Sequence, residues 1–206
     1  FCVDIIKIMN ILICGSLHSG CERILRLIIH IFKQKELPLN VIQNYQKNNT
    51  SIQSIKNTSD DHKVSTVCVC TNFWDVYSDI KEFDHVITCI RDCRTICNTV
   101  PEMIKYCERI QCWNIFSNVT LKYELYGPSQ IIEITQRLEL PFNYKEIIEF
   151  LEKVRITTIK ENSIEWNENE IKNTFLVNKY LHEFGYYNTI QKMKEREMHH
   201  SVSWSS

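Results

Sequence analysis

Residues 11–25, ILICGSLHSGCERIL, contain two glycines spaced as in a loop that surrounds an oxyanion. An apolar run ends at Gly15, Gly20 closes a short polar segment, and an amphipathic pattern begins after it. Glycines let backbone N–H groups converge on one point, and the N-terminus of a following helix adds positive potential. The spacing therefore predicts a strand, an anion-binding loop and a helix; the alternative is a plain strand-to-helix turn.

The residues after Gly20 do not fit a loop that binds nucleoside triphosphates. Such a loop continues with Lys and then Ser or Thr, which contact the phosphates and Mg²⁺. Here Cys21 and Glu22 occupy those two positions. A conventional ATPase or GTPase is therefore not expected, and a divergent P-loop nucleotide kinase is kept as an alternative.

A second candidate motif is VITCIRDCRTICNT, residues 86–99. Arg91 follows an apolar run that predicts a strand, and open parallel sheets bind ligands outside the carboxyl ends of their strands. The Arg91 guanidinium is a planar fork suited to phosphate, and Thr99 offers a hydroxyl from the helix expected next. The alternative is that Arg91 pairs with Asp92 or caps a carbonyl, and that Thr99 is incidental.

Together the two motifs resemble those of the PAPS-dependent sulfotransferases, PAPS being 3′-phosphoadenosine 5′-phosphosulfate. The family's loop reads approximately Lys/Arg-Ser-Gly-Thr/Ser-Thr/Ser, and residues 18–22 here read His-Ser-Gly-Cys-Glu. The family's second motif is Arg-x-Pro-Arg/Lys-Asp-x-x-x-Ser, and here Arg91, Arg94 and Thr99 match its two cations and its hydroxyl. The stretch LKYELYGPSQIIEITQRLELPFN, residues 121–143, is also similar to the family, so the resemblance covers residues 9–187.

This resemblance implies a sulfotransferase-like, P-loop NTPase-like α/β fold: a three-layer domain with a parallel sheet flanked by helices. It implies transfer of a sulfuryl group from PAPS to a hydroxyl or amine of a small-molecule or glycan acceptor, with no metal. His18 would assist the leaving group as the catalytic residue. The residues that would hold PAPS or its product adenosine 3′,5′-bisphosphate are Gly15, Ser16, His18, Ser19, Gly20, Cys21, Arg91 and Thr99.

The departures from the family pattern leave a second function open. His18 stands where active members have Lys or Arg, and the Glu22 carboxylate would repel a 5′-phosphate unless its side chain turns into solvent or binds a cation. No general base can be assigned, because Asp75 and Asp79 read as solvated loop residues, as do Asp60, Asp61 and His62. The family's C-terminal Arg-Lys-Gly element has no clear copy, although Arg155 or Lys160 would be substitutes. The alternative is a catalytically degenerate protein of this fold that acts in binding.

The elements that must position these residues alternate between strand and helix. Apolar or β-branched runs predict strands over 10–14, 64–70, 85–90 and 118–126. Helical spacing or capping signals predict helices over 22–34, 94–108, 128–137 and 168–184, and one that begins after Asn143. Residues 40–63, rich in Asn, Ser, Gln and Lys, predict a long loop. This alternation is typical of a parallel sheet covered on both faces.

The composition fits one globular domain and excludes several classes. With 206 residues and a net charge of −1, the chain has no general attraction to nucleic acid or to acidic membranes. No apolar run reaches the roughly 18 to 20 residues of a membrane span, and no signal-peptide layout is present. We therefore expect a cytoplasmic protein, with residues 1–8 as an extension before Met9 and 188–206 as a flexible tail. The oligomeric state stays open.

The chain's ten cysteines are expected to be reduced thiols. Several fall inside apolar runs, including Cys14, Cys68, Cys70 and Cys89, and a free cysteine behaves as a small buried hydrophobe. Their spacing lacks the paired Cys-x-x-Cys of a structural zinc site. No metal site is therefore predicted.

Overall fold

The computed structural model describes residues 8–16, 19–45, 55, 64–140, 144–153, 164 and 166–187. The chain divides into two compact units, where the sequence predicts one domain. The first consists of Phe1–Arg91 and Arg109–Lys160, and the second of Asp92–Glu108 and Glu161–Ser206. The expected N-terminal extension, apart from its last residue, and the expected C-terminal tail lie outside the described residues.

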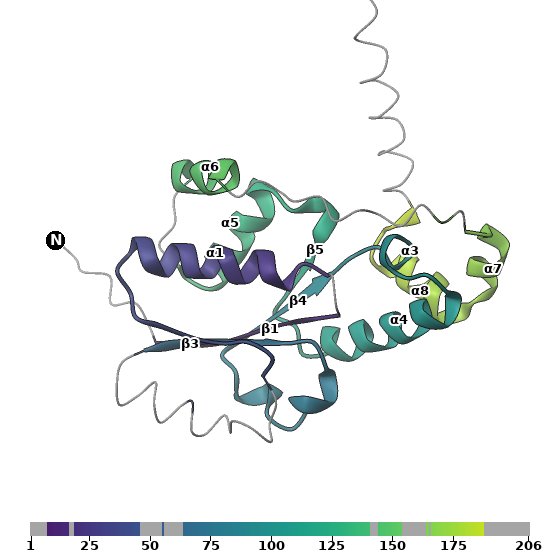
Figure 1. Cartoon of the computed structure of the whole chain (residues 1–206), viewed down its shortest axis with the longest axis horizontal. Helices are drawn as coiled ribbons and strands as arrows, with labels where there is room; N and C mark the ends of the chain where they lie inside the picture. Colours follow the sequence, from purple (N-terminus) through teal and green to yellow (C-terminus); the bar gives the residue numbers. More distant parts are fainter. Residues whose placement is uncertain are drawn as a thin grey trace, which may run out of the picture. The chain divides into compact units, whose positions relative to one another are not determined.

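The first unit is built on a five-stranded parallel sheet with the strand order β2-β3-β1-β4-β5 (Figure 1). The strands are β1 (Asn10–Gly15), β2 (Leu39–Ile42), β3 (Ser65–Cys70), β4 (His85–Ile90) and β5 (Val119–Lys122). This sheet and its helices confirm the predicted α/β class. The chain leaves β1 for β2 on one side and leaves β4 for β5 on the other, so the carboxyl ends of β1 and β4 lie together where the direction of winding reverses. Ligands of open parallel sheets bind at such a place.

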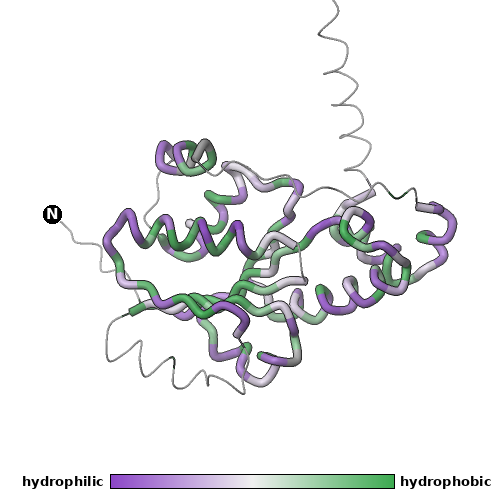
Figure 2. Tube along the Cα trace, viewed as in Figure 1, coloured by the Kyte–Doolittle hydropathy of each residue, from purple (hydrophilic) through white to green (hydrophobic). Residues whose placement is uncertain are grey.

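The three inner strands β3, β1 and β4 are covered on both faces, and nearly every residue in them is therefore buried. Side chains alternate between faces along a strand. Ile11 and Ile13 pack into one core with helices α1 (Cys21–Gln34), α5 (Pro128–Arg137) and α6 (Tyr144–Lys153). Leu12 and Cys14 point to the other face and are also fully buried. The tube coloured by hydropathy shows the result as a hydrophobic centre with purple, hydrophilic segments around it (Figure 2).

Helix α1 illustrates how the sequence determines this packing. Its buried residues, including Ile24, Leu25, Ile28 and Ile31, recur with helical spacing and form one apolar face. Among the described residues, no helix combines the length and the apolar character that a membrane span requires.

Two predictions for the first unit need correction. Residues 40–63 were expected to form a loop, but β2 occupies Leu39–Ile42 and pairs with β3. Its four residues are partly or fully exposed, so it has no continuous apolar run by which to recognise a strand. The strand expected over 118–126 ends at Lys122, and Tyr123–Leu125 form the 3₁₀ turn η3.

Two helices predicted as continuous are each interrupted in the structure. The helix expected over 94–108 is two helices, α3 (Cys93–Ile96) and α4 (Val100–Asn114), and α4 ends six residues later than predicted. Cys97 takes extended backbone angles between them. The helix expected over 168–184 is α7 (Glu168–Asn173) and α8 (Phe175–Glu183), separated at Thr174, whose backbone is extended.

Candidate functional site

The loop between β1 and α1 begins with a glycine that no other residue can replace without movement. A Cβ atom on Gly15 would lie 2.5 Å from the carbonyl oxygen of Cys89 and 2.4 Å from Oγ of Ser19. The carbonyl belongs to β4, where Cys89 is the register partner of Gly15. Because that oxygen is part of the sheet backbone, the glycine is required for the loop to close against β4.

The second glycine of the motif starts helix α1. Gly20 has φ of 105° and ψ of 8°, a left-handed conformation that favours glycine. The first intrahelical hydrogen bond runs from Arg23 N–H to the Gly20 carbonyl at 3.0 Å. The N–H groups of Cys21 and Glu22 precede it and therefore have no intrahelical acceptor. Together with the helix dipole they make this end of α1 the electropositive end.

A backbone hydrogen bond connects the two ends of the loop. The backbone N–H of Ser19 donates to the Ser16 carbonyl at 3.1 Å, and both serines are at least 90% buried. His18, the predicted catalytic residue, lies outside the described residues. The structure thus brings together Gly15, Ser16, Ser19, Gly20 and Cys21 of the predicted loop.

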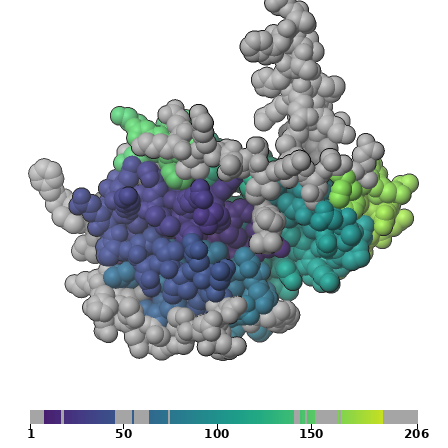
Figure 3. Space-filling view, in the orientation of Figure 1, coloured from purple at the N-terminus to yellow at the C-terminus, as the bar shows by residue number. Residues whose placement is uncertain are grey.

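Glu22 does not point into this loop. Its Oε1 accepts a hydrogen bond from Nε of Arg26 at 3.1 Å, one helical turn further along α1. The Glu22 side chain is 60% exposed. The purple segment that contains α1 forms part of the surface seen in Figure 3. The carboxylate that would repel a phosphate is therefore turned into solvent and paired with a cation.

Arg91 follows β4 at the same edge of the sheet, but it is almost fully buried, with 1% of its surface exposed. Its guanidinium carbon lies 4.1 Å from the centre of the Tyr123 ring. The guanidinium of Arg23, from the first turn of α1, lies 3.8 Å from the same ring centre and donates a hydrogen bond to the Tyr123 hydroxyl. Two cations therefore gather around one aromatic ring, which also lies 3.1 Å from the Cβ position of Gly20.

A small pocket opens beside this cluster. Its lining combines cations, aromatic rings and the loop backbone; the residues are Ser19, Gly20, Arg23, Ile24, Cys89, Leu121, Lys122, Tyr123, Tyr126 and Gln130. Motif matching did not select Arg23 as a site residue, because the family pattern requires no cation there. The contact that would have revealed it joins residues 100 positions apart in the sequence.

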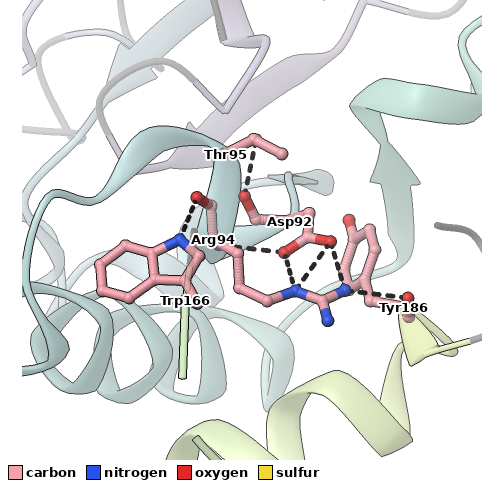
Figure 4. A network of polar contacts seen from close by, with 5 residues as sticks. All are labelled: Asp92, Arg94, Thr95, Trp166 and Tyr186. Atoms are coloured by element: carbon pink, nitrogen blue, oxygen red, sulfur yellow. Dashed lines mark hydrogen bonds and ion pairs between the residues drawn. The ribbon is translucent and has the colours of Figure 1, made fainter. Parts of the chain in front are cut away.

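Arg94, the second cation of the sulfotransferase-like motif, is held by neighbours in the second unit (Figure 4). Its Nη2 lies 2.7 Å from Oδ2 of Asp92 and donates to the Tyr186 carbonyl at 3.0 Å. Burial opposes the charge on Arg94, but the Asp92 carboxylate outweighs it and raises the pKa of the guanidinium. The Arg94 carbonyl in turn accepts from the indole N–H of Trp166. Asp92 thus pairs with the second arginine of the motif, Arg94.

Thr99 has a structural role in the second unit. Its hydroxyl oxygen accepts a hydrogen bond from the Glu102 N–H at 3.3 Å, so it caps the start of α4. The side chain is exposed. The prediction that Thr99 lies inside the helix is therefore wrong by one residue, since Val100 is the first helical position.

The candidate bases differ in their surroundings. Asp79 was expected to be solvated, but it is 8% exposed and accepts hydrogen bonds from the hydroxyls of Tyr45 and Ser78. Asp75 is partly buried at the end of the 3₁₀ turn η1 (Phe73–Asp75). The remaining candidates, Asp60, Asp61, His62, Arg155 and Lys160, lie outside the described residues.

The nine cysteines of the described ranges are free, and eight of them are buried, as their apolar neighbours predict. Cys21 and Cys89 meet beside the loop. A hydrogen bond with Cys89 lowers the pKa of the Cys21 thiol despite its burial, and the same bond, with burial, raises the pKa of Cys89.

In comparisons with known proteins, no protein-family model, no curated protein and no solved structure matches this chain.

Proposed function

We propose that this chain is a sulfotransferase-like protein, which binds PAPS or adenosine 3′,5′-bisphosphate and transfers a sulfuryl group to a hydroxyl or amine acceptor. The observation that carries the proposal is the meeting of a glycine loop, a helix N-terminus and two arginines at the carboxyl ends of β1 and β4. The strand order and the loop after β1 also support a P-loop-like assignment.

The loop geometry is suited to the charge that develops in such a transfer. The sulfur–oxygen bond to the 5′-phosphate breaks as a new one forms to the acceptor oxygen, so negative charge grows on the phosphate. The electropositive first turn of α1 and the Arg23 guanidinium would stabilise that charge. Glu22 does not oppose it, because its carboxylate pairs with Arg26 in solvent. His18 remains the proposed catalytic residue.

The alternative of a binding protein without transferase activity has an observation in its favour. Of the two arginines that match the second motif, Arg94 is committed to Asp92 and to the Tyr186 carbonyl. The second cation of the motif is thus held by protein groups, and the Thr99 hydroxyl accepts from the Glu102 N–H at the start of α4. Losing a hydrogen bond to a charged group costs about 1.5–3 kcal/mol, so retained but weakened nucleotide binding would be expected.

Calorimetric titration tests the proposal with two ligands, adenosine 3′,5′-bisphosphate and ATP with Mg²⁺. We expect the bisphosphate to bind with a dissociation constant of roughly 1 μM to 1 mM and ATP not to bind. Binding of ATP alone would favour the nucleotide kinase, and binding of neither would refute the proposed function. If the bisphosphate binds but no labelled sulfuryl group is transferred from PAPS to any hydroxyl or amine acceptor, the chain is the binding protein without transferase activity.

Two matched arginine variants identify the site. Arg91→Lys keeps the charge but removes the planar fork, and we expect it to weaken bisphosphate binding about tenfold or more. Arg26→Ala removes an exposed cation of α1 and should leave the affinity within about twofold, because exposed pairs contribute little. Thermal melting of both variants separates a binding defect from loss of folding.

A further inference from the structure

Two cysteines, Cys21 and Cys89, lie next to Gly15 at the base of the loop. Gly15 on β1 and Cys89 on β4 are register partners. A Cβ atom built on Gly15 would lie 2.5 Å from the Cys89 carbonyl oxygen and 3.1 Å from Sγ of Cys21. Cys21 arrives there from the first turn of α1, and its side chain is hydrogen bonded to that of Cys89. The start of α1 and strand β4 therefore meet at Cys21 and Cys89.

The two thiols are chemically unequal. Hydrogen bonds with the Cys89 thiol and with Oγ of Ser19 lower the pKa of the Cys21 thiol. The Ser19 oxygen lies 3.5 Å from Sγ of Cys21. Cys21 also lies at the N-terminus of a helix, where thiolates are favoured. The hydrogen bond with Cys21, together with burial, raises the pKa of the Cys89 thiol. Because the thiolate is the nucleophile, the position of Cys21 at the helix N-terminus favours it as the attacking sulfur, with Cys89 as the resolving one.

We propose that Cys21 and Cys89 form a redox-active thiol pair that hydrogen peroxide closes reversibly into a disulfide. The Cys21 thiolate attacks one peroxide oxygen, which gives a sulfenic acid and releases hydroxide; that hydroxide takes up one proton to become water. The Cys89 sulfur then displaces the sulfenic oxygen as hydroxide, which takes the Cys89 proton and leaves as water. Two thiols and one peroxide thus give one disulfide and two waters.

The surroundings of the neighbouring cysteines favour Cys21 and Cys89 as the pair that forms the disulfide. Cys89 lines the pocket beside Ser19 and Gly20, which gives a small peroxide a route to the pair. Cys14 is instead directed to the Ile87 carbonyl and the Thr88 hydroxyl, both 3.4 Å away, and burial raises its pKa. Cys70 is directed to the Asn72 carbonyl at 3.2 Å.

Closure of the disulfide would act on the loop above it. A disulfide holds its sulfurs about 2 Å apart, which is closer than hydrogen-bonded thiols lie. The first residue of α1 would therefore be drawn toward β4, next to Gly15 and Ser19. The reaction itself does not depend on the proposed function, since it needs only the two thiols and the peroxide.

Peptide mapping of the peroxide-treated native protein tests the pair. Trypsin leaves Cys89 as the lone cysteine of residues 82–91 but leaves Cys14 and Cys21 together in residues 8–23. We expect these two peptides to be cross-linked, to lose two hydrogen atoms, and to separate on addition of dithiothreitol. Fragmentation should assign the bond to Cys21. A bond assigned to Cys14, or no cross-link while other thiols are oxidised, would overturn the proposal.

Three serine variants complete the experiment, each first checked for folding by thermal melting. Cys21→Ser should abolish the cross-link. Cys89→Ser should leave a sulfenic acid at Cys21, trapped as its dimedone adduct, which a merely structural thiol would not form. Cys112→Ser, at the partly buried thiol of α4, should leave the cross-link unchanged. If a variant does not fold, the wild-type map alone decides, because it names both bonded residues.

Discussion

Replacing Gly15 with alanine tests how closely the loop packs against β4. The new methyl group would meet the Cys89 carbonyl at 2.5 Å and the Ser19 hydroxyl at 2.4 Å, well inside van der Waals contact. The Ser19 hydroxyl can rotate away, but the carbonyl is fixed by the pairing of β1 with β4. Overpacking of this kind costs about 1–3 kcal/mol. A cost of about 2 kcal/mol lowers the Tm of a chain of this size by roughly 4–8 °C.

Thermal melting followed by circular dichroism measures this effect, with Gly127→Ala as the matched control. Gly127 has extended backbone angles, and its Cβ would lie 3.7 Å from the nearest atom, the Leu125 carbonyl oxygen. The control should therefore change stability by less than about 1 kcal/mol. Equal Tm values for wild type and Gly15→Ala would refute the close approach of the loop to β4.

Three further predictions follow from individual contacts. Asp92→Ala leaves the Arg94 cation buried without its carboxylate and should cost about 3–5 kcal/mol, whereas Glu168→Ala, from an exposed pair, should cost less than about 1 kcal/mol; equal losses of Tm would contradict the buried pair. Burial raises the pKa of Cys68 to about 12, so the thiol of the unfolded chain loses its proton at a lower pH than that of the folded chain. Stability should therefore fall as the pH rises from 9 toward 12. Over that range the Tm of the wild type should fall relative to the Tm of Cys68→Ser, and a constant difference between the two would contradict the assignment. Glu22→Gln should change bisphosphate affinity by less than about threefold in calorimetry, because the exposed carboxylate is screened by solvent and by Arg26; a larger gain would show that Glu22 faces the ligand.

The parts of the fold that the sequence predicts are those with strong local patterns. The buried runs of β1, β3 and β4 and the amphipathic face of α1 appear where the sequence predicts them. Strand β2 was missed because its short, partly exposed run has no periodicity, and only pairing with β3 makes it a strand. The break at Thr174 was missed because α7 and α8 continue one helical pattern, and a single extended residue leaves that pattern almost unchanged.

Within the candidate site, the sequence predicts the loop but not the partners of its side chains. The two glycines could be identified because their spacing follows from backbone geometry. The orientation of the Glu22 side chain depends on its ion pair with Arg26, one turn further along the same helix. The i, i+4 spacing of a Glu and an Arg is a sequence signal for such a pair. The gathering of Arg23 and Arg91 around Tyr123 joins three distant segments, which no local pattern encodes.

Nuclear magnetic resonance of protein labelled with ¹⁵N only at glycine tests the central claim most directly. The chain has four glycines, and Gly15 and Gly20 belong to the loop while Gly185 ends α8 in the second unit. On titration with adenosine 3′,5′-bisphosphate, the account predicts saturable shifts of the Gly15 and Gly20 amide signals and no shift for Gly185. Unchanged Gly15 and Gly20 signals at saturating nucleotide would contradict a phosphate site in this loop.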